Sequence, residues 1–166
     1  VEISRSYLEM LSRAKNEIII MSGYFLPGHS IRNALIRAVK RGVAVKIIIA
    51  GESDVKIAKA AERYWYPFLL RNHIRIFEYQ RGILHGKLSV YDEKWVTVGS
   101  YNLNHISAYA SIELNLDVLD ENFGKQTTLE LNRIIETECA EIKPEHFIQQ
   151  QTLLKKFSYW MSYRIY

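Results

Sequence analysis

Apolar and polar positions repeat with two different spacings along the chain. In residues 3–14 apolar side chains recur every three or four positions, as on one helical face, and the same spacing returns over Ile31–Val39. A short apolar block of strand length follows each segment, at Glu17–Met21 and at Val43–Ala50. Helices that alternate with strands predict a layered α/β domain.

The remaining segments continue this alternation. Ser30 is expected to cap the helix that Gly42 ends, and Pro67 is expected to kink or divide a helix that starts at about Val55. Further strands are expected at 74–79, 83–91, 95–99 and 112–119, and two closing helices at 121–137 and 144–157. No repeat or linker separates these elements, so residues 1–166 are expected to form a single domain.

The segment Leu84-His85-Gly86-Lys87 carries the first candidate chemistry. A strand over 83–91 would project His85 and Lys87 from one face, about 7 Å apart. The imidazole can attack phosphorus or donate a proton, and the ammonium offsets negative charge on phosphoryl oxygens. Gly86 between them lets a ligand or a neighbouring backbone approach closely. The same spacing is also typical of a solvated strand face, so His85 and Lys87 alone do not distinguish a catalytic site from an ordinary exposed strand.

Short polar residues follow the next expected strand. Gly99 permits an unusual backbone angle, and Ser100 and Asn102 supply groups able to bind phosphoryl oxygens or catalytic side chains. Residues 112–119 alternate strictly, with Glu113 on the polar side. A carboxylate that reaches the imidazole would fix its tautomer and stabilise an imidazolium.

Taken together, these residues resemble the signature of the phospholipase D superfamily, the HKD motif. In that signature a His and a Lys two positions apart are followed, after four further residues, by an Asp. The matching residues are His85, Lys87, Asp92, Gly99, Ser100, Asn102 and Glu113. Residues 22–27, 41–47 and 82–85 look like the C-terminal catalytic half of bacterial cardiolipin synthases, and the whole resemblance covers roughly residues 5–120.

The resemblance implies a fold and a reaction. The fold is the phospholipase D-like α/β/α sandwich, a mixed β-sheet flanked by helices on both faces. The reaction is phosphatidyl transfer or phosphodiester hydrolysis through a phosphohistidine, without a metal or another cofactor. His85 is then the nucleophile or the general acid, a choice that stays open, and Lys87 and Asn102 hold the phosphoryl oxygens.

The remaining matched residues surround this centre. Ser100 is expected beside the site as a substrate-binding residue, and Glu113 is expected to orient His85. Asp92 completes the catalytic signature, but its place in a hairpin turn favours a structural role over contact with substrate. Tyr24, at the end of the first strand, is expected to line the mouth of the cleft.

The family brings two such motifs to one site, and this chain has one. The second motif is expected from a missing N-terminal half of the parent protein or from a symmetric homodimer. The first residue is Val rather than Met, which favours a trimmed or processed chain and therefore the missing half.

Composition and charge indicate which kinds of binding partner the chain favours. The net charge of +4 suits a phosphate-bearing partner, and the resemblance implies a phosphatidylglycerol-like phospholipid. No run of about eighteen apolar residues exists. Aromatic residues and Arg164 within 157–164 suit a membrane interface, so we expect peripheral attachment to the cytoplasmic face of a bacterial membrane, with any membrane segments elsewhere in the parent protein. The lone Cys139 excludes an intrachain disulfide and is expected to pack within a helix.

Two other functions remain open at this point. A homodimeric phosphodiesterase or nuclease with one motif per chain would need a basic groove for a phosphate backbone, and no strong Lys/Arg stripe is present, which makes nucleic acid the less favoured partner. A non-catalytic phosphate-binding domain would not need the complete set of His85, Lys87, Asn102 and Glu113.

Overall fold

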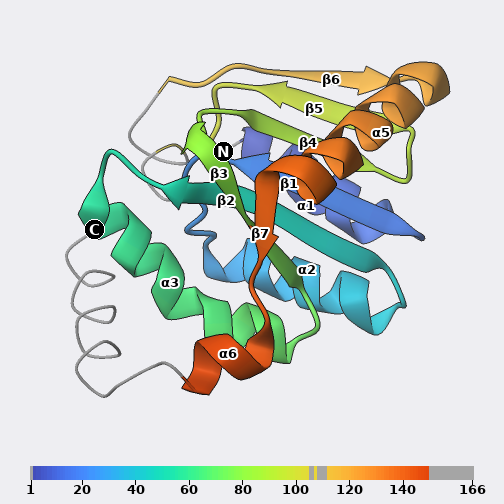
Figure 1. The fold of residues 1–166 in the computed structure, drawn as a ribbon. Coiled ribbons are helices and arrows are strands. Elements are labelled where there is room, and N and C mark those ends of the chain that lie inside the picture. Colours follow the sequence, from blue (N-terminus) through green and yellow to red (C-terminus); the bar gives the residue numbers. More distant parts are fainter. Residues whose placement is uncertain (1, 105–106, 108–111, 150–166) are drawn as a thin grey trace.

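The computed structural model describes residues 2–104, 107 and 112–149. In this part of the chain a seven-stranded sheet has the strand order β6-β5-β4-β1-β2-β3-β7 (Figure 1). The strands are β1 (Glu17–Ser22), β2 (Ala44–Glu52), β3 (Arg75–Ile83), β4 (Lys87–Tyr91), β5 (Trp95–Gly99), β6 (Asn115–Leu119) and β7 (Cys139–Glu141). The helices are α1 (Glu2–Arg13), α2 (His29–Lys40), α3 (Lys56–Arg71), α5 (Glu121–Glu138) and α6 (Pro144–Gln149).

The sheet is mixed. β1 pairs in parallel with β2 and β2 with β3, and each connection passes through a helix. The pairs β1–β4, β4–β5, β5–β6 and β3–β7 are antiparallel. Because β4 runs against β1, Ser22 at the end of β1 lies opposite Lys87 at the start of β4.

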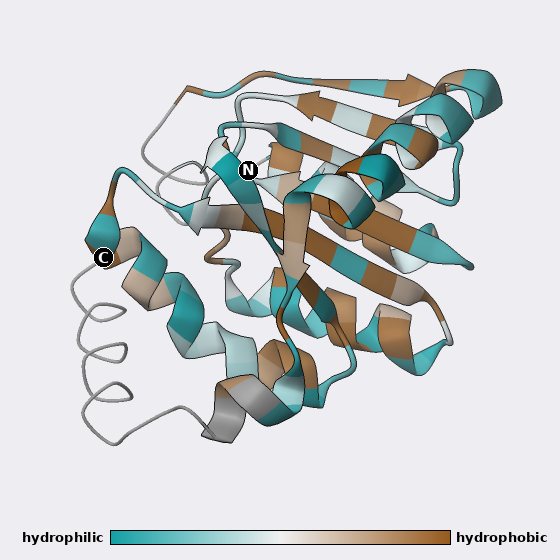
Figure 2. Cartoon of the chain, in the orientation of Figure 1, coloured by the Kyte–Doolittle hydropathy of each residue, from teal (hydrophilic) through white to brown (hydrophobic). Residues whose placement is uncertain are grey.

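Helices cover both faces of this sheet. Along β1 successive side chains point to opposite faces. Ile18 and Ile20 lie in an apolar cluster with buried residues of α1, α2 and α3, whereas Ile19 and Met21 cluster with Leu131 of α5. Figures 1 and 2 show α5 crossing one side of the sheet and the apolar run along β2 in its centre. The predicted α/β/α sandwich is confirmed.

Two local expectations were wrong, and a third, that Pro67 kinks or divides a helix, was wrong about the division. Pro67 does not divide α3, whose final turns stay packed through the buried Tyr66 and Leu69. Ser30 does not cap α2, because the helix begins at His29 after Gly28 and has no side-chain cap. Cys139 opens the edge strand β7 instead of lying in a helix.

Two strands are shorter than expected. β4 begins at Lys87, so residues 84–86 form an irregular connection that contains His85. β6 begins at Asn115, so Glu113 precedes the strand. Part of the final expected helix, 150–157, lies outside the described residues. Among the described residues, no helix is long and apolar enough to cross a bilayer.

Candidate active site

The predicted site residues other than Asp92 lie near one end of the sheet. The register places Ser22 opposite Lys87, and Gly99 opposite Asn115. The end of β1, the start of β4, the end of β5 and the start of β6 therefore meet at the same edge (Figure 1). Four segments distant in sequence thus supply His85, Asn102 and their neighbours to one region.

His85 and Lys87 differ in exposure. His85 is exposed, and its ring forms no hydrogen bond with any described residue. Lys87 is only 7% exposed, and its Nζ donates to the backbone carbonyl oxygen of His85 at 2.7 Å. Burial lowers the pKa of the Lys87 ammonium, and the negative charge of Glu113 works in the opposite direction. The His85 imidazole is therefore accessible, and the partly desolvated Lys87 ammonium lies against the His85 backbone.

Gly23 allows the loop after β1 to approach the histidine. A Cβ at this position would lie 2.9 Å from the Leu84 carbonyl oxygen and 3.5 Å from the Cα of His85. Any larger residue would push against the connection that carries the imidazole. At Gly86 the close neighbour is the Met21 side chain, whose sulfur would lie 2.7 Å from an added Cβ. Gly86 thus makes room for a side chain of the adjacent strand.

Asn102 lies against this same loop. Its Oδ1 accepts from the backbone N–H of Tyr24 at 3.3 Å, and its own N–H donates to Ser107 Oγ at 3.3 Å. The Leu26 N–H donates to the Leu103 carbonyl at 2.8 Å and ties the two segments together. Among the described residues, Asn102 Nδ2 donates to none.

Glu113 contacts a different residue from the one expected. Ser100 Oγ donates to the Glu113 carboxylate and accepts from the Leu114 N–H at 3.0 Å. Within the described part of the chain, the Glu113 carboxylate forms no hydrogen bond with the His85 ring. Because pairing with β5 starts at Asn115, Glu113 lies beside the end of β5 and meets Ser100 first. Its orienting role stays a prediction.

Asp92 does not join the site. It follows the far end of β4, roughly 16 Å along the strand from Lys87. Its Oδ2 accepts from the Lys15 N–H at 2.7 Å, and its Oδ1 accepts from Asn16 at 2.7 Å and from Glu17 at 2.9 Å. These contacts fix the start of β1 and support the structural role expected from the hairpin turn.

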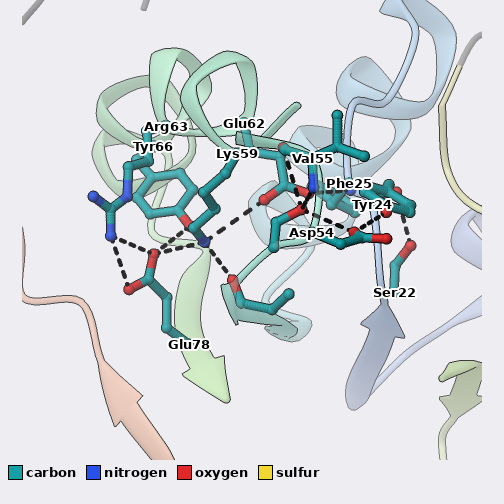
Figure 3. A network of polar contacts seen from close by, with 12 residues as sticks. Ser22, Tyr24, Phe25, Asp54, Val55, Lys59, Glu62, Arg63, Tyr66 and Glu78 are labelled. Carbon is teal, nitrogen blue, oxygen red and sulfur yellow. Dashed lines mark hydrogen bonds and ion pairs between the residues drawn. The ribbon is translucent and has the colours of Figure 1, made fainter. Parts of the chain in front are cut away.

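Tyr24 links the site to α3. Its backbone N–H contacts Asn102, and its hydroxyl donates to Asp54, which precedes the helix (Figure 3). That hydrogen bond lowers the pKa of the exposed Asp54 carboxyl. Sequence reasoning missed the next residue of this link, Glu62, which accepts the Phe25 N–H from inside α3. Its signal was a carboxylate at a position that the apolar spacing assigns to the buried face.

Among residues 2–104, 107 and 112–149, no group of three or more His, Cys, Asp or Glu side chains is arranged to hold a metal ion.

Comparison with known proteins gives the family. The family model described as "Cardiolipin synthase, PLD-like domain" matches residues 7–135. The chain belongs to this phospholipase D-like family. Cardiolipin synthase B of Escherichia coli (strain K12) is 38% identical over 159 residues, which are 96% of this chain and 37% of that protein. Cardiolipin synthase A of Buchnera aphidicola is 32% identical over 133 residues, 80% of this chain and 27% of the relative. The chain therefore spans well under half of these relatives.

Solved structures agree on the phospholipase D-like fold. Nuc of Salmonella typhimurium, a phospholipase D family member, superposes with a TM-score of 0.71 at 22% identity, over 84% of this chain and 90% of that one. The phosphatidylserine synthase of Haemophilus influenzae superposes with a TM-score of 0.73 at 16% identity, over 99% of this chain and 44% of that one. At these identities the likeness concerns the fold alone.

Proposed function

We propose that this domain supplies one half of the active site of a phosphatidyltransferase of the cardiolipin synthase type. The observation that carries the proposal is the pairing of an exposed, unbonded His85 imidazole with the buried Lys87 ammonium. A reacting imidazole needs a free nitrogen, and a phosphoryl group needs a cation that water does not screen. Asn102, which contacts the loop after β1, would supply its Nδ2 as a second donor.

The reaction would proceed in two displacements. One imidazole attacks the phosphorus of a phosphatidylglycerol-like lipid, the bond from phosphorus to the leaving alcohol breaks, and an acid protonates that oxygen. An acceptor alcohol then attacks the phosphohistidine, the phosphorus–nitrogen bond breaks, and the same acid, now a base, takes the acceptor's proton. One imidazole cannot attack and protonate in the same step, so His85 takes one role and a second motif supplies the other.

An apolar surface beside the site supports a second half. Val98, Leu114 and Leu116, which we call the β5–β6 apolar surface, are 38%, 79% and 62% exposed. Val98 pairs with Leu116 where β5 ends, next to Ser100 and Glu113. Exposed apolar groups that cluster at a site edge are typical of a protein interface. We assign this surface to the other phospholipase D-like half of the parent protein, in preference to a second copy of this chain.

The lipid substrate implies a membrane surface. We propose peripheral binding at the cytoplasmic face, supported by the net charge of +4. The aromatic segment 157–164, which sequence analysis assigned to the interface, lies outside the described residues.

The test uses the full parent protein and vesicles that contain phosphatidylglycerol. Wild type should form cardiolipin, and mass spectrometry of a rapidly quenched reaction should detect a phosphoryl adduct on one active-site histidine. His85→Asn should abolish turnover with the fold retained by circular dichroism. An adduct on His85 assigns it as nucleophile; an adduct confined to the other motif assigns His85 as the acid. Normal turnover by His85→Asn would overturn the proposal.

A further inference from the structure

A cluster of charged side chains is buried between α3 and the sheet (Figure 3). Lys59, Glu62 and Glu78 are 9%, 2% and 6% exposed, and Tyr66 between them is 1% exposed. Ionised groups are rarely buried unless they are paired, so each charge in this cluster needs a partner.

Glu78 is paired within the cluster. Its Oε1 lies 2.8 Å from Lys59 Nζ, accepts from the Tyr66 hydroxyl at 2.7 Å, and lies 3.3 Å from Arg63 Nη2. Burial by itself would raise the pKa of Glu78, but Lys59 and Arg63 outweigh it, and the pKa is lowered. Glu78 is therefore a structural carboxylate with its charge compensated.

Glu62, unlike Glu78, accepts a hydrogen bond from a residue outside the cluster. Its Oε1 accepts from the Phe25 N–H at 2.7 Å. Its Oε2 lies 3.6 Å from Lys59 Nζ and accepts no hydrogen bond from a described residue. Burial raises the pKa of Glu62 to about 7; Lys59 and the Phe25 N–H oppose the rise, and the charge of Glu78 adds to it.

Phe25 belongs to the loop that contacts the active site. Directly before it, the Tyr24 N–H donates to Asn102 Oδ1, and Gly23 packs against the Leu84 carbonyl and the Cα of His85. Residues 23–25 thus lie between the buried carboxylate on one side and the reacting segments on the other. Three consecutive residues leave little freedom for one end to move without the other.

We propose that Glu62 is a positioning residue for the active site: its carboxylate holds the Phe25 N–H and so fixes the loop 23–25 against His85 and Asn102. The inference rests on the proposed function for the reaction that this loop serves. An ionised carboxylate holds an N–H more strongly than its protonated form, so the loop is held more firmly as Glu62 ionises. The charged groups that face Glu62 are Lys59 on α3 and Glu78 on β3, and Arg63 faces it through Glu78.

The experiment compares Glu62→Leu and Glu62→Gln with Glu78→Gln as matched control. Glu78→Gln damages the same cluster but contacts no loop residue. In the 166-residue chain, amide hydrogen exchange at Phe25 should accelerate about tenfold or more in Glu62→Leu, remain slow in Glu62→Gln, and be unchanged in Glu78→Gln after correction for global stability. In the full parent enzyme, Glu62→Leu should lower kcat about tenfold with little change in KM, and Glu62→Gln should recover most of it.

Other outcomes separate the hypotheses. Unchanged Phe25 exchange in a folded Glu62→Leu, or equal kcat losses in Glu62→Leu and Glu78→Gln, would overturn the positioning role. If Glu62→Leu does not fold, the pH dependence of Phe25 protection decides: after correction for intrinsic exchange and global stability, wild type should gain protection from pH 6 to 8, and Glu62→Gln should not. The same dependence in both proteins would contradict the proposal. Absence of transferase activity in the wild-type parent would refute the proposed function and leave the exchange result standing.

Discussion

The Lys87 ammonium donates to the carbonyl oxygen of His85 at 2.7 Å, so the two motif residues are tied together through the backbone. This bond uses one of the three N–H donors of Lys87, and the proposed function assigns the others to phosphoryl oxygens. The spacing of two residues thus brings a buried cation to the backbone of an exposed histidine, and His85 itself precedes the strand that begins at Lys87.

Lys87→Met should separate catalysis from stability. Loss of the cation should reduce phosphodiester turnover by about a hundredfold to a thousandfold. Because Lys87 is 7% exposed, an apolar chain of similar length should leave the melting temperature equal or slightly higher. Turnover assays at a temperature well below unfolding, together with a thermal melt, check both parts. Turnover above about a tenth of wild type would contradict the assigned role.

Asp92→Ala should have the opposite effect to Lys87→Met: it should lower stability and leave turnover nearly unchanged. Three backbone N–H groups, of Lys15, Asn16 and Glu17, lose their acceptor, which should cost about 1–3 kcal/mol in urea unfolding. Asp92→Asn keeps an Oδ1 acceptor and should cost less. Since Asp92 lies at the far end of β4, kcat should stay within about twofold of wild type while the protein is folded. A selective loss of kcat in stable Asp92→Asn would place this residue in the chemistry.

The layers of the fold could be predicted from the sequence, and so could the residues that meet at the candidate site; their catalytic roles stay predictions. Apolar spacing identified the helices of both faces, and the motif identified His85, Lys87 and Asn102, which the register indeed brings to one sheet edge. The local sequence predicts these helices and strands because the spacing of apolar residues along an element reflects which of its faces is buried.

What could not be predicted depends on contacts distant in sequence. Leu84 fits the alternation of a strand over 83–91, but Gly23 packs against the Leu84 carbonyl and pairing of β4 begins at Lys87. The partner of Glu113 depends on where pairing with β5 starts, which places Ser100 nearest. Strand β7 spans three residues, too short for any periodicity.

Glu113→Gln should shift the alkaline limb of the pH profile. The charge of Glu113 raises the pKa of Lys87 against the lowering caused by burial. Without that charge the Lys87 pKa falls further, the ammonium is lost at lower pH, and the alkaline limb of kcat/KM moves to lower pH. Ser100→Ala, which keeps the carboxylate, serves as the control and should move the limb less. A limb displaced to higher pH would contradict the electrostatic coupling.

Glu62 should make stability depend on pH. Its folded pKa of about 7 lies above the ordinary value of 4.5, so its protonated form is favoured by folding. Its contribution is therefore fully present below pH 4.5 and is lost as pH rises through about 7. The unfolding free energy of wild type minus that of Glu62→Gln should fall over this range by about 1–3 kcal/mol in urea titrations. A difference that stays constant with pH would show that Glu62 does not titrate in the fold.

The final prediction concerns the second motif. Because one imidazole cannot both attack phosphorus and protonate the leaving oxygen, the monomeric 166-residue chain should be nearly inert, and adding the separately expressed other half should restore turnover. Leu116→Glu places a charge in the β5–β6 apolar surface and should weaken that complementation at least about tenfold. Leu119→Glu is the matched control, since Leu119 is similarly exposed at 69% on the same strand but pairs with Trp95 at the end away from the site.

Size-exclusion chromatography run beside the assay identifies the active species. Robust turnover by a strict monomer would overturn the need for two motifs. An active symmetric dimer that Leu116→Glu dissociates would show that a second copy of this chain, and not the other half of the parent protein, occupies the surface.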